Sequence, residues 1–143
     1  MKKTIFLLAL LLLVGAAASW AGVFMNVPWY TSWGDTPSTI YSGWTTWYYQ
    51  HDGYIKGLRC SYFHNDENNV VMVLEYSNDN ELVGITYYTE DVNIGASFLT
   101  SMIKHYGQGT VTNDGDLEWT NVLGETVTIE TGDKGMTVWE EAD

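Results

Sequence analysis

Residues 70–107 read VVMVLEYSNDNELVGITYYTEDVNIGASFLTSMIKHYG, and this stretch decides the fold. It begins with two apolar, β-branched and aromatic runs, residues 70–76 and 82–88, on either side of the polar residues 77–80. Runs of this kind around an Asn- and Asp-rich turn predict a β-hairpin. The first run is apolar on both faces, which is typical of a strand in the middle of a sheet.

The hydrophobic spacing then lengthens to that of a helix. Apolar side chains share one helical face: Ile94, Phe98, Leu99, Met102, Ile103 and Tyr106. This spacing predicts an amphipathic helix. Asp91 or Asn93 can cap its first turn, and Gly107 can take the left-handed conformation that ends a helix. The stretch is therefore expected to form a hairpin of a sheet with one helix laid across it.

The rest of the chain predicts more strands and a second, shorter helix. Asp35 followed by Pro37 is typical of a helix start, and this helix is expected to end near Gly43. Further strands are expected over residues 44–50, 54–64, 126–130 and 136–140, and another is expected to begin at residues 117–119 and to turn at residues 122–125. A turn is also expected at residues 51–53. The predicted class is α+β. It is a single domain, residues 22–143, with an antiparallel sheet of about six strands and one long and one short helix packed on one face.

The N-terminus has the pattern of an export signal. Two lysines precede an uninterrupted apolar run, residues 5–14, and residues 16–21, AAASWA, then offer small residues at the positions that a signal peptidase reads. A signal peptidase could cut after Ala18 or after Ala21. We favour Ala21, which makes residues 1–21 a cleaved signal peptide. The alternative is an uncleaved membrane anchor, but an anchor needs roughly 20 apolar residues. The protein is predicted to be periplasmic or secreted.

The chain is strongly acidic, with 6 basic and 18 acidic residues and a net charge of −12. Two of the basic residues belong to the predicted signal peptide, so the mature protein would be more negative still. Such a field repels nucleic acid and anionic lipid, which we exclude as main partners, and it favours cationic partners. The alternative is that the charge only keeps an exported protein soluble.

The sequence predicts no catalytic residues, no metal and no cofactor. Cys60 and His64 are four residues apart, but four residues of a strand span about 13 Å, too far to share a proton. Cys60 is the only cysteine. It is expected to be a buried apolar side chain and can form no internal disulfide. The three histidines, at positions 51, 64 and 105, lack the spacing of metal ligands.

Asp114, Asp116 and Glu118 alternate, which on a regular strand would place their side chains about 6.6 Å apart on one face. Glycoside hydrolases use a pair of catalytic carboxylates at a separation of this order. Gly115 indicates a turn instead, and an acidic turn is ordinarily solvated. The acidic turns also lack the twelve-residue loop of a calcium site.

An aromatic-rich segment, residues 22–53, is the best candidate for binding. Exposed Trp and Tyr side chains can stack on sugar rings or anchor a protein interface, and the alternative is that they fill the core of a small domain. The candidate binding residues are Trp29, Tyr30, Trp33, Trp44, Trp47 and Tyr48.

Two segments resemble a loose group of small, uncharacterised exported bacterial α+β proteins. Residues 27–32, VPWYTS, are similar to the Pro-Trp-Gly-x-Ser opening of that group, although Tyr30 replaces the usual glycine. Residues 98–107, FLTSMIKHYG, followed by LEWT at 117–120, are similar to its pattern of a helix, Tyr-Gly and a strand with Trp. The resemblance implies a periplasmic α+β domain and carries no catalytic residues.

These observations favour a non-enzymatic, exported, acidic binding protein that holds a cationic protein partner. A sharper version is an inhibitor of a cationic hydrolase such as lysozyme, because opposite charge speeds association. The alternative is a carbohydrate or peptidoglycan-binding module that uses exposed Trp and Tyr. A small hydrolase built on the acidic turn near Asp114 is the third hypothesis. Salt separates the first two, since only a charge-steered complex weakens as salt rises.

Overall fold

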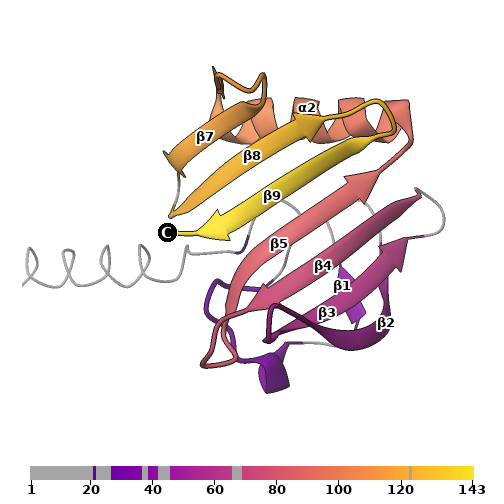
Figure 1. Cartoon of the computed structure of the whole chain (residues 1–143), viewed down its shortest axis with the longest axis vertical. Helices are drawn as coiled ribbons and strands as arrows, with labels where there is room; N and C mark the ends of the chain where they lie inside the picture. The colour runs from indigo at the N-terminus through magenta and orange to yellow at the C-terminus, as the bar shows by residue number, and fades with distance from the viewer. Residues whose placement is uncertain (1–20, 22–26, 37–38, 42–45, 66–68, 123) are drawn as a thin grey trace, which may run out of the picture.

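The protein is built on one antiparallel β-sheet, crossed on one face by one α-helix (Figure 1). The computed structural model describes residue 21 and residues 27–36, 39–41, 46–65, 69–122 and 124–143. Nine strands are hydrogen-bonded in the order β1-β2-β3-β4-β5-β9-β8-β7-β6. The elements are η1 (Trp33–Asp35), β1 (Thr39–Tyr41), β2 (Thr46–Ile55), β3 (Leu58–Asn65), β4 (Val70–Tyr76), β5 (Leu82–Thr89), α2 (Val92–Tyr106), β6 (Thr110–Val111), β7 (Leu117–Val122), β8 (Glu125–Thr131) and β9 (Met136–Ala142).

Two meanders make up the sheet, and α2 connects them. Strands β1 to β5 pair in chain order. The chain then passes through α2 to the far edge of the sheet and returns through β6, β7 and β8 to β9, which pairs with β5. In Figure 1, α2 lies behind the sheet, and no described helix covers the face turned to the viewer. Within the described part of the chain, the sheet therefore has one covered face and one open face.

The predicted class, α+β with about six strands and two helices, is wrong. The described protein is mostly β, with nine strands and one α-helix. Where a short helix was expected, the chain forms the three-residue 3-10 turn Trp33–Asp35 and the strand Thr39–Tyr41, which pairs with Thr46–Tyr48. Thr, Ile and Tyr favour a strand, and the ladder with β2 outweighs the local helix signal of the proline. Residues 37–38 and 42–45, including the expected helix end near Gly43, lie outside the described residues.

The predicted turn at residues 51–53 is also wrong, because these residues lie inside β2. The chain turns later, at Lys56 and Gly57, whose φ angles are 51° and 81°. Gly53 is opposite Cys60 in the ladder, and a Cβ on Gly53 would lie 3.0 Å from the Tyr62 ring. Gly53 therefore leaves space for the ring of Tyr62. The local sequence pattern cannot distinguish a glycine with this role from a glycine in a turn.

The predicted hairpin and long helix are confirmed. β4 pairs with β5, and α2 follows with Asp91 as its N-cap. The Asp91 Oδ1 atom accepts hydrogen bonds from the N–H groups of Asn93 and Ile94 at 2.9 and 3.1 Å. Gly107 ends the helix with a φ of 85°, and its N–H donates to the carbonyl of Ile103. Local capping and spacing were sufficient to predict this part of the chain.

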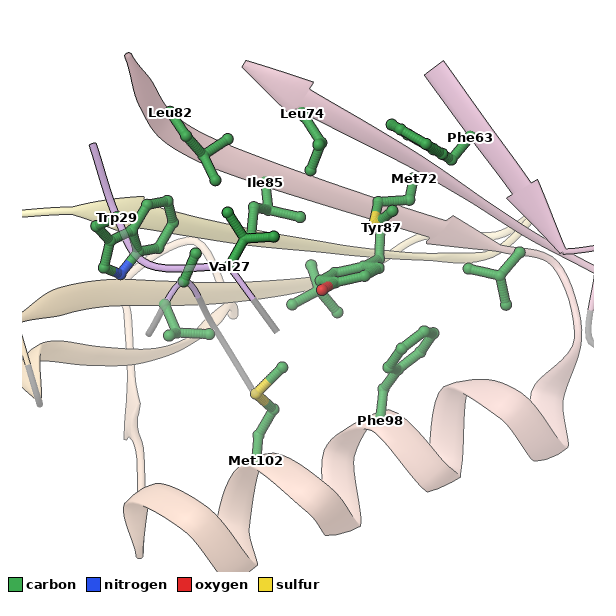
Figure 2. Close-up of a cluster of buried hydrophobic side chains, with 14 of the residues drawn as sticks. Val27, Trp29, Phe63, Met72, Leu74, Leu82, Ile85, Tyr87, Phe98 and Met102 are labelled. Atoms are coloured by element: carbon green, nitrogen blue, oxygen red, sulfur yellow. The ribbon is translucent and has the colours of Figure 1, made fainter. Parts of the chain in front are cut away.

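The hydrophobic core lies between the covered face of the sheet, α2 and a short N-terminal segment, residues 27–29. Figure 2 shows Phe98 and Met102 of α2 directed toward the sheet, with Val27 and Trp29 alongside them. The sheet contributes Phe63, Met72, Leu74, Leu82, Ile85, Tyr87, Val127, Ile129 and Val138. Cys60 is 1% exposed, which confirms the predicted buried cysteine, and no disulfide is available to it.

Candidate functional site

The structure separates the six aromatic residues predicted to bind. Trp29 is only 5% exposed and its Nε1 donates to the Glu125 carboxylate at 2.9 Å, so it belongs to the core and is no binding surface. Tyr30 is 49% exposed, and its hydroxyl donates to the carbonyl of Asp143.

Of the remaining four predicted residues, Trp33 lies near β2, and the backbones of Trp47 and Tyr48 belong to β2. Trp33 is half-buried, with the Arg59 guanidinium 4.0 Å from the centre of its ring. Trp44 lies outside the described residues, as do the side chains of Trp47 and Tyr48, whose backbones belong to β2. Arg59 already occupies one face of the Trp33 ring, which leaves less of that ring for a ligand.

A broader surface is the open face, formed by the outward side chains of β3, β4, β5, β9 and β8. Residues opposite each other in an antiparallel sheet share a face, so the ladders define rows across it. The central row is Tyr62, Val73, Thr86, Trp139 and Thr128, and the next row is His64, Val71, Tyr88, Thr137 and Glu130.

The centre of the open face is aromatic and partly exposed. Tyr88 is 37% exposed and Val71 is 40% exposed, while Tyr62 and Trp139 are half-buried. Sequence reasoning missed these aromatics because the concentration of Trp and Tyr in residues 22–53 is the stronger compositional signal. Alternation was the available signal in β9: Val138 points to the core, so Trp139 must point away from it.

Carboxylates lie at the margins of the open face. Glu75 and Glu141 occupy a third row with Gly84 between them, and Glu130 ends the second row. A Cβ on Gly84 would lie 3.1 Å from the Glu75 Oε2 atom, so the glycine makes space for this carboxylate. Glu75 also accepts a hydrogen bond from the Thr86 hydroxyl at 3.0 Å. None of the described residues in the three rows is Lys or Arg, so this surface is acidic.

A cavity of about 640 Å³ opens at the end of the open face beside Tyr88. Its walls include His64, Asn65, Val71 and Glu90. The Tyr88 hydroxyl donates to Glu90 at 3.1 Å, and desolvation together with this acidic neighbour raises the pKa of Tyr88. The cavity extends the acidic and aromatic character of the face to its edge.

The acidic turn near Asp114 is closed by its own hydrogen bonds. The Thr112 N–H donates to the Asp116 carbonyl, the Asp116 N–H donates to the Thr112 hydroxyl, and Gly115 has a φ of 86°. Asp114 is exposed at the tip. The turn predicted from Gly115 is therefore confirmed, and it breaks the strand geometry that a carboxylate pair would need.

Among the described residues, no group of three or more His, Cys, Asp and Glu side chains could hold a metal ion. In the same part of the chain, no helix has the length and apolar character to cross a membrane.

Comparison of this chain with protein-family models, with curated proteins and with solved structures found no match. The resemblance to small exported bacterial proteins therefore stays a prediction, and the function must be argued from the site itself.

Proposed function

We propose that the protein is an exported, non-enzymatic binding protein whose open face holds a cationic protein partner. The observation that carries this proposal is the combination of Tyr62, Tyr88 and Trp139 at the centre of an uncovered sheet face with carboxylates at its margins. An inhibitor of a cationic hydrolase such as lysozyme is the specific version that we favour.

The aromatic centre supplies the contact energy. Tyr and Trp are the residue types that dominate binding hot spots, and their ring faces also attract Lys and Arg side chains. Trp139 lies between Thr86 and Thr128 in the ladder, so it is held on two paired strands rather than on a loop. A rigid platform of this kind loses little conformational entropy on binding.

The acidic margin supplies selectivity and speed of association. Glu130 and Glu141 are exposed, and the whole chain carries a net charge of −12. Complementary charge steers diffusional encounter and rejects anionic partners, and its effect declines as salt screens it. A basic partner fits this surface better than a neutral or acidic one.

A glycan is the second candidate ligand. Trp139 is flanked by the hydroxyl-bearing residues Thr86 and Thr128. An aromatic ring beside hydroxyl groups can stack on a sugar and bind its polar edge. A sugar complex of this kind would respond little to salt, which separates the two candidates.

Trp139→Ala is expected to weaken binding of a purified cationic lysozyme by about 2 kcal/mol or more, roughly 30-fold in Kd. The double variant Glu130→Lys/Glu141→Lys is expected to slow association and to flatten its dependence on salt. The measurement is surface plasmon resonance at low and high salt, with insoluble peptidoglycan binding assayed in parallel.

Asp114→Lys is the charge control, because Asp114 is exposed in a turn away from the three rows. It should leave binding nearly unchanged. If lysozyme binds the wild type and all variants alike, the open face is not the site. Retention on peptidoglycan at both salt concentrations, lost in Trp139→Ala, would replace the protein partner by a glycan.

We also propose that the signal peptide is cut after Ala18 and not after Ala21. Ala21 has no exposed surface, lies in the core cluster, and its N–H donates to the Val27 carbonyl at 2.8 Å. A mature chain that keeps Ala21 keeps this packing. The intact mass of the exported protein should therefore correspond to a chain beginning at Ser19, and a chain beginning at Gly22 would contradict the proposal.

A further inference from the structure

The turn between β2 and β3 forms a tip that differs from the rest of the surface. Residues 54–59 read YIKGLR, and we call them the basic tip. Lys56 and Gly57 have φ angles of 51° and 81°, and two consecutive positive φ angles are typical of the tight two-residue turn that joins hairpin strands. The basic tip is therefore a well-defined end of two paired strands rather than a long loop.

The basic tip exposes large apolar side chains. Tyr54 is 67% exposed, Ile55 is 42% exposed and Leu58 is 38% exposed. Ile55 and Leu58 are opposite each other in the ladder, so they lie on the same side of the hairpin, and Tyr54 lies on the other side. Single exposed apolar residues are ordinary, but three of them within five positions form a contiguous group, which indicates an interaction surface.

The basic tip also has the opposite charge to the rest of the chain. The basic residues after Ala21 are Lys56, Arg59, Lys104 and Lys134, so two of these four lie in the tip. No Asp or Glu lies within residues 54–59, although the whole chain has a net charge of −12. The Arg59 guanidinium lies over the Trp33 ring, whereas Lys56 is exposed at the turn. An apolar and cationic tip fits an apolar and acidic partner surface.

A surface of this kind lies at the end of the open face, in the cavity beside Tyr88. Val71 and Tyr88 are opposite each other in the ladder and are 40% and 37% exposed. The same cavity is lined by the carboxylates of Glu90 and Asp91, and Glu90 is exposed. None of the described residues that line it is Lys or Arg. The cavity therefore matches the basic tip in both apolar character and charge.

One molecule cannot place its own tip in its own cavity. β3 begins at Leu58, in the basic tip, and ends at Asn65, in the cavity wall. This strand has eight residues, which span about 26 Å. The two surfaces can therefore meet only between two molecules. Acidic molecules repel each other at long range, but the Debye length at physiological salt is about 8 Å, so this repulsion is screened more than charges in direct contact.

We propose that the basic tip of one molecule docks in the Tyr88 cavity of a second copy of the protein. Lys56 pairs with Glu90, and the apolar side chains of the tip pack against Val71 and the Tyr88 ring. The contact is head-to-tail, so each copy keeps an unoccupied tip or cavity and assembly is open-ended. The inference rests on the function proposed for the open face, because the tip acts as a cationic ligand that the chain itself carries.

Two double variants each remove one half of the contact. Lys56→Asn/Leu58→Thr changes the tip and preserves the hairpin, because Asn-Gly is a preferred dipeptide of this turn and Thr favours a strand. Val71→Thr/Glu90→Gln changes the cavity at two exposed positions. Each variant should raise the dissociation constant of self-association by about tenfold or more.

Lys104→Gln/Val111→Thr is the matched control. It also removes one lysine and one exposed apolar side chain, but from α2 and β6, away from the basic tip and the cavity. Its self-association should equal that of the wild type. Circular dichroism of the three variants checks that each is folded.

Sedimentation velocity of the mature protein at physiological salt measures the assembly. The weight-average mass of the wild type should keep rising with concentration through the high micromolar range. The tip variant and the cavity variant should each stay largely monomeric, and a 1:1 mixture of the two should form a dimer. The mixture associates because the intact tip of one variant meets the intact cavity of the other.

Carbodiimide cross-linking of the wild type, followed by mass spectrometry, needs no variant. It should join Lys56 of one copy to Glu90 of another, and isotope-labelled and unlabelled chains in one sample show that the link is between molecules. A wild type that stays monomeric and gives no such link would overturn the inference. Association of either variant alone at the strength of the wild type would also overturn it, because tip-to-tip or cavity-to-cavity contact would then explain the assembly.

Lysozyme binding distinguishes this inference from the proposed function. Lys56→Asn/Leu58→Thr should bind lysozyme as the wild type does, since its open face is intact. Lysozyme binding without self-association contradicts only the inference, and self-association that the cavity variant loses, without lysozyme binding, contradicts only the proposed function. If a monomeric wild type sediments with phosphatidylethanolamine–phosphatidylglycerol vesicles and the tip variant does not, the tip contacts a lipid surface and the second copy is rejected.

Discussion

Phe98→Ala is expected to lower the free energy of unfolding by about 3–5 kcal/mol. Phe98 is 1% exposed, and its ring centre lies 5.5 Å from that of Tyr87. Figure 2 shows Phe98 directed from α2 toward the sheet. The substitution removes these contacts and leaves a cavity between the helix and β5. Because small domains are stable by only about 5–15 kcal/mol, a loss of this size is a large part of the total.

Urea unfolding followed by circular dichroism measures this effect, with an unchanged m-value indicating that the unfolded state is the same. Ile103→Ala is the matched control, since Ile103 lies on the same helix but is 37% exposed. It should cost about 1 kcal/mol or less. Equal losses for the two variants would mean that α2 does not pack on the sheet through Phe98.

Trp29→Ala is the second substitution with a large expected effect, again about 3–5 kcal/mol. Trp29 is buried against the core, and its Nε1 donates to the carboxylate of Glu125. The variant therefore creates a cavity and removes a hydrogen bond to a buried acid, a combination that costs more than either change alone. Thermal unfolding should show a midpoint lowered by on the order of 10 °C.

Tyr30→Ala is the neighbouring control, because Tyr30 is 49% exposed and should lose far less stability. Measuring both binding and stability separates the roles of the two faces of the sheet. Trp139→Ala should weaken ligand binding while the protein stays folded, whereas Trp29→Ala should lower stability first. If Trp29→Ala is as stable as wild type but has lost binding, then Trp29 is a binding residue after all and its place in the core is wrong.

The part of the fold that the sequence predicted is the part whose signals are local. The hairpin of β4 and β5, α2, its cap at Asp91 and its end at Gly107 all follow from residues within a few positions of one another. The inward direction of Val127 and Ile129 also followed from strand alternation, which is a local rule, and the burial of Cys60 followed from its residue type.

The candidate site was much less predictable. Trp29 and Trp139 are both tryptophans on the same chain, yet one is 5% exposed in the core and the other is half-buried on the open face. Composition indicated that aromatics would matter. It could not say which of them face water, because that depends on where α2 and the N-terminal segment are placed over the sheet.

The sequence by itself determined the central hairpin, the amphipathic helix and the acidic charge, since each depends on local spacing or on composition. Only the tertiary structure decided that β9 returns to pair with β5, that Tyr62, Tyr88 and Trp139 share an open face, and that Glu125 and Glu140 lie in the core. The physical reason is that side-chain burial and cross-strand neighbours are set by pairings between residues far apart in the chain. The local sequence pattern around a Glu in an alternating strand is the same whether that face of the sheet is covered or open, so it cannot predict the burial of the Glu.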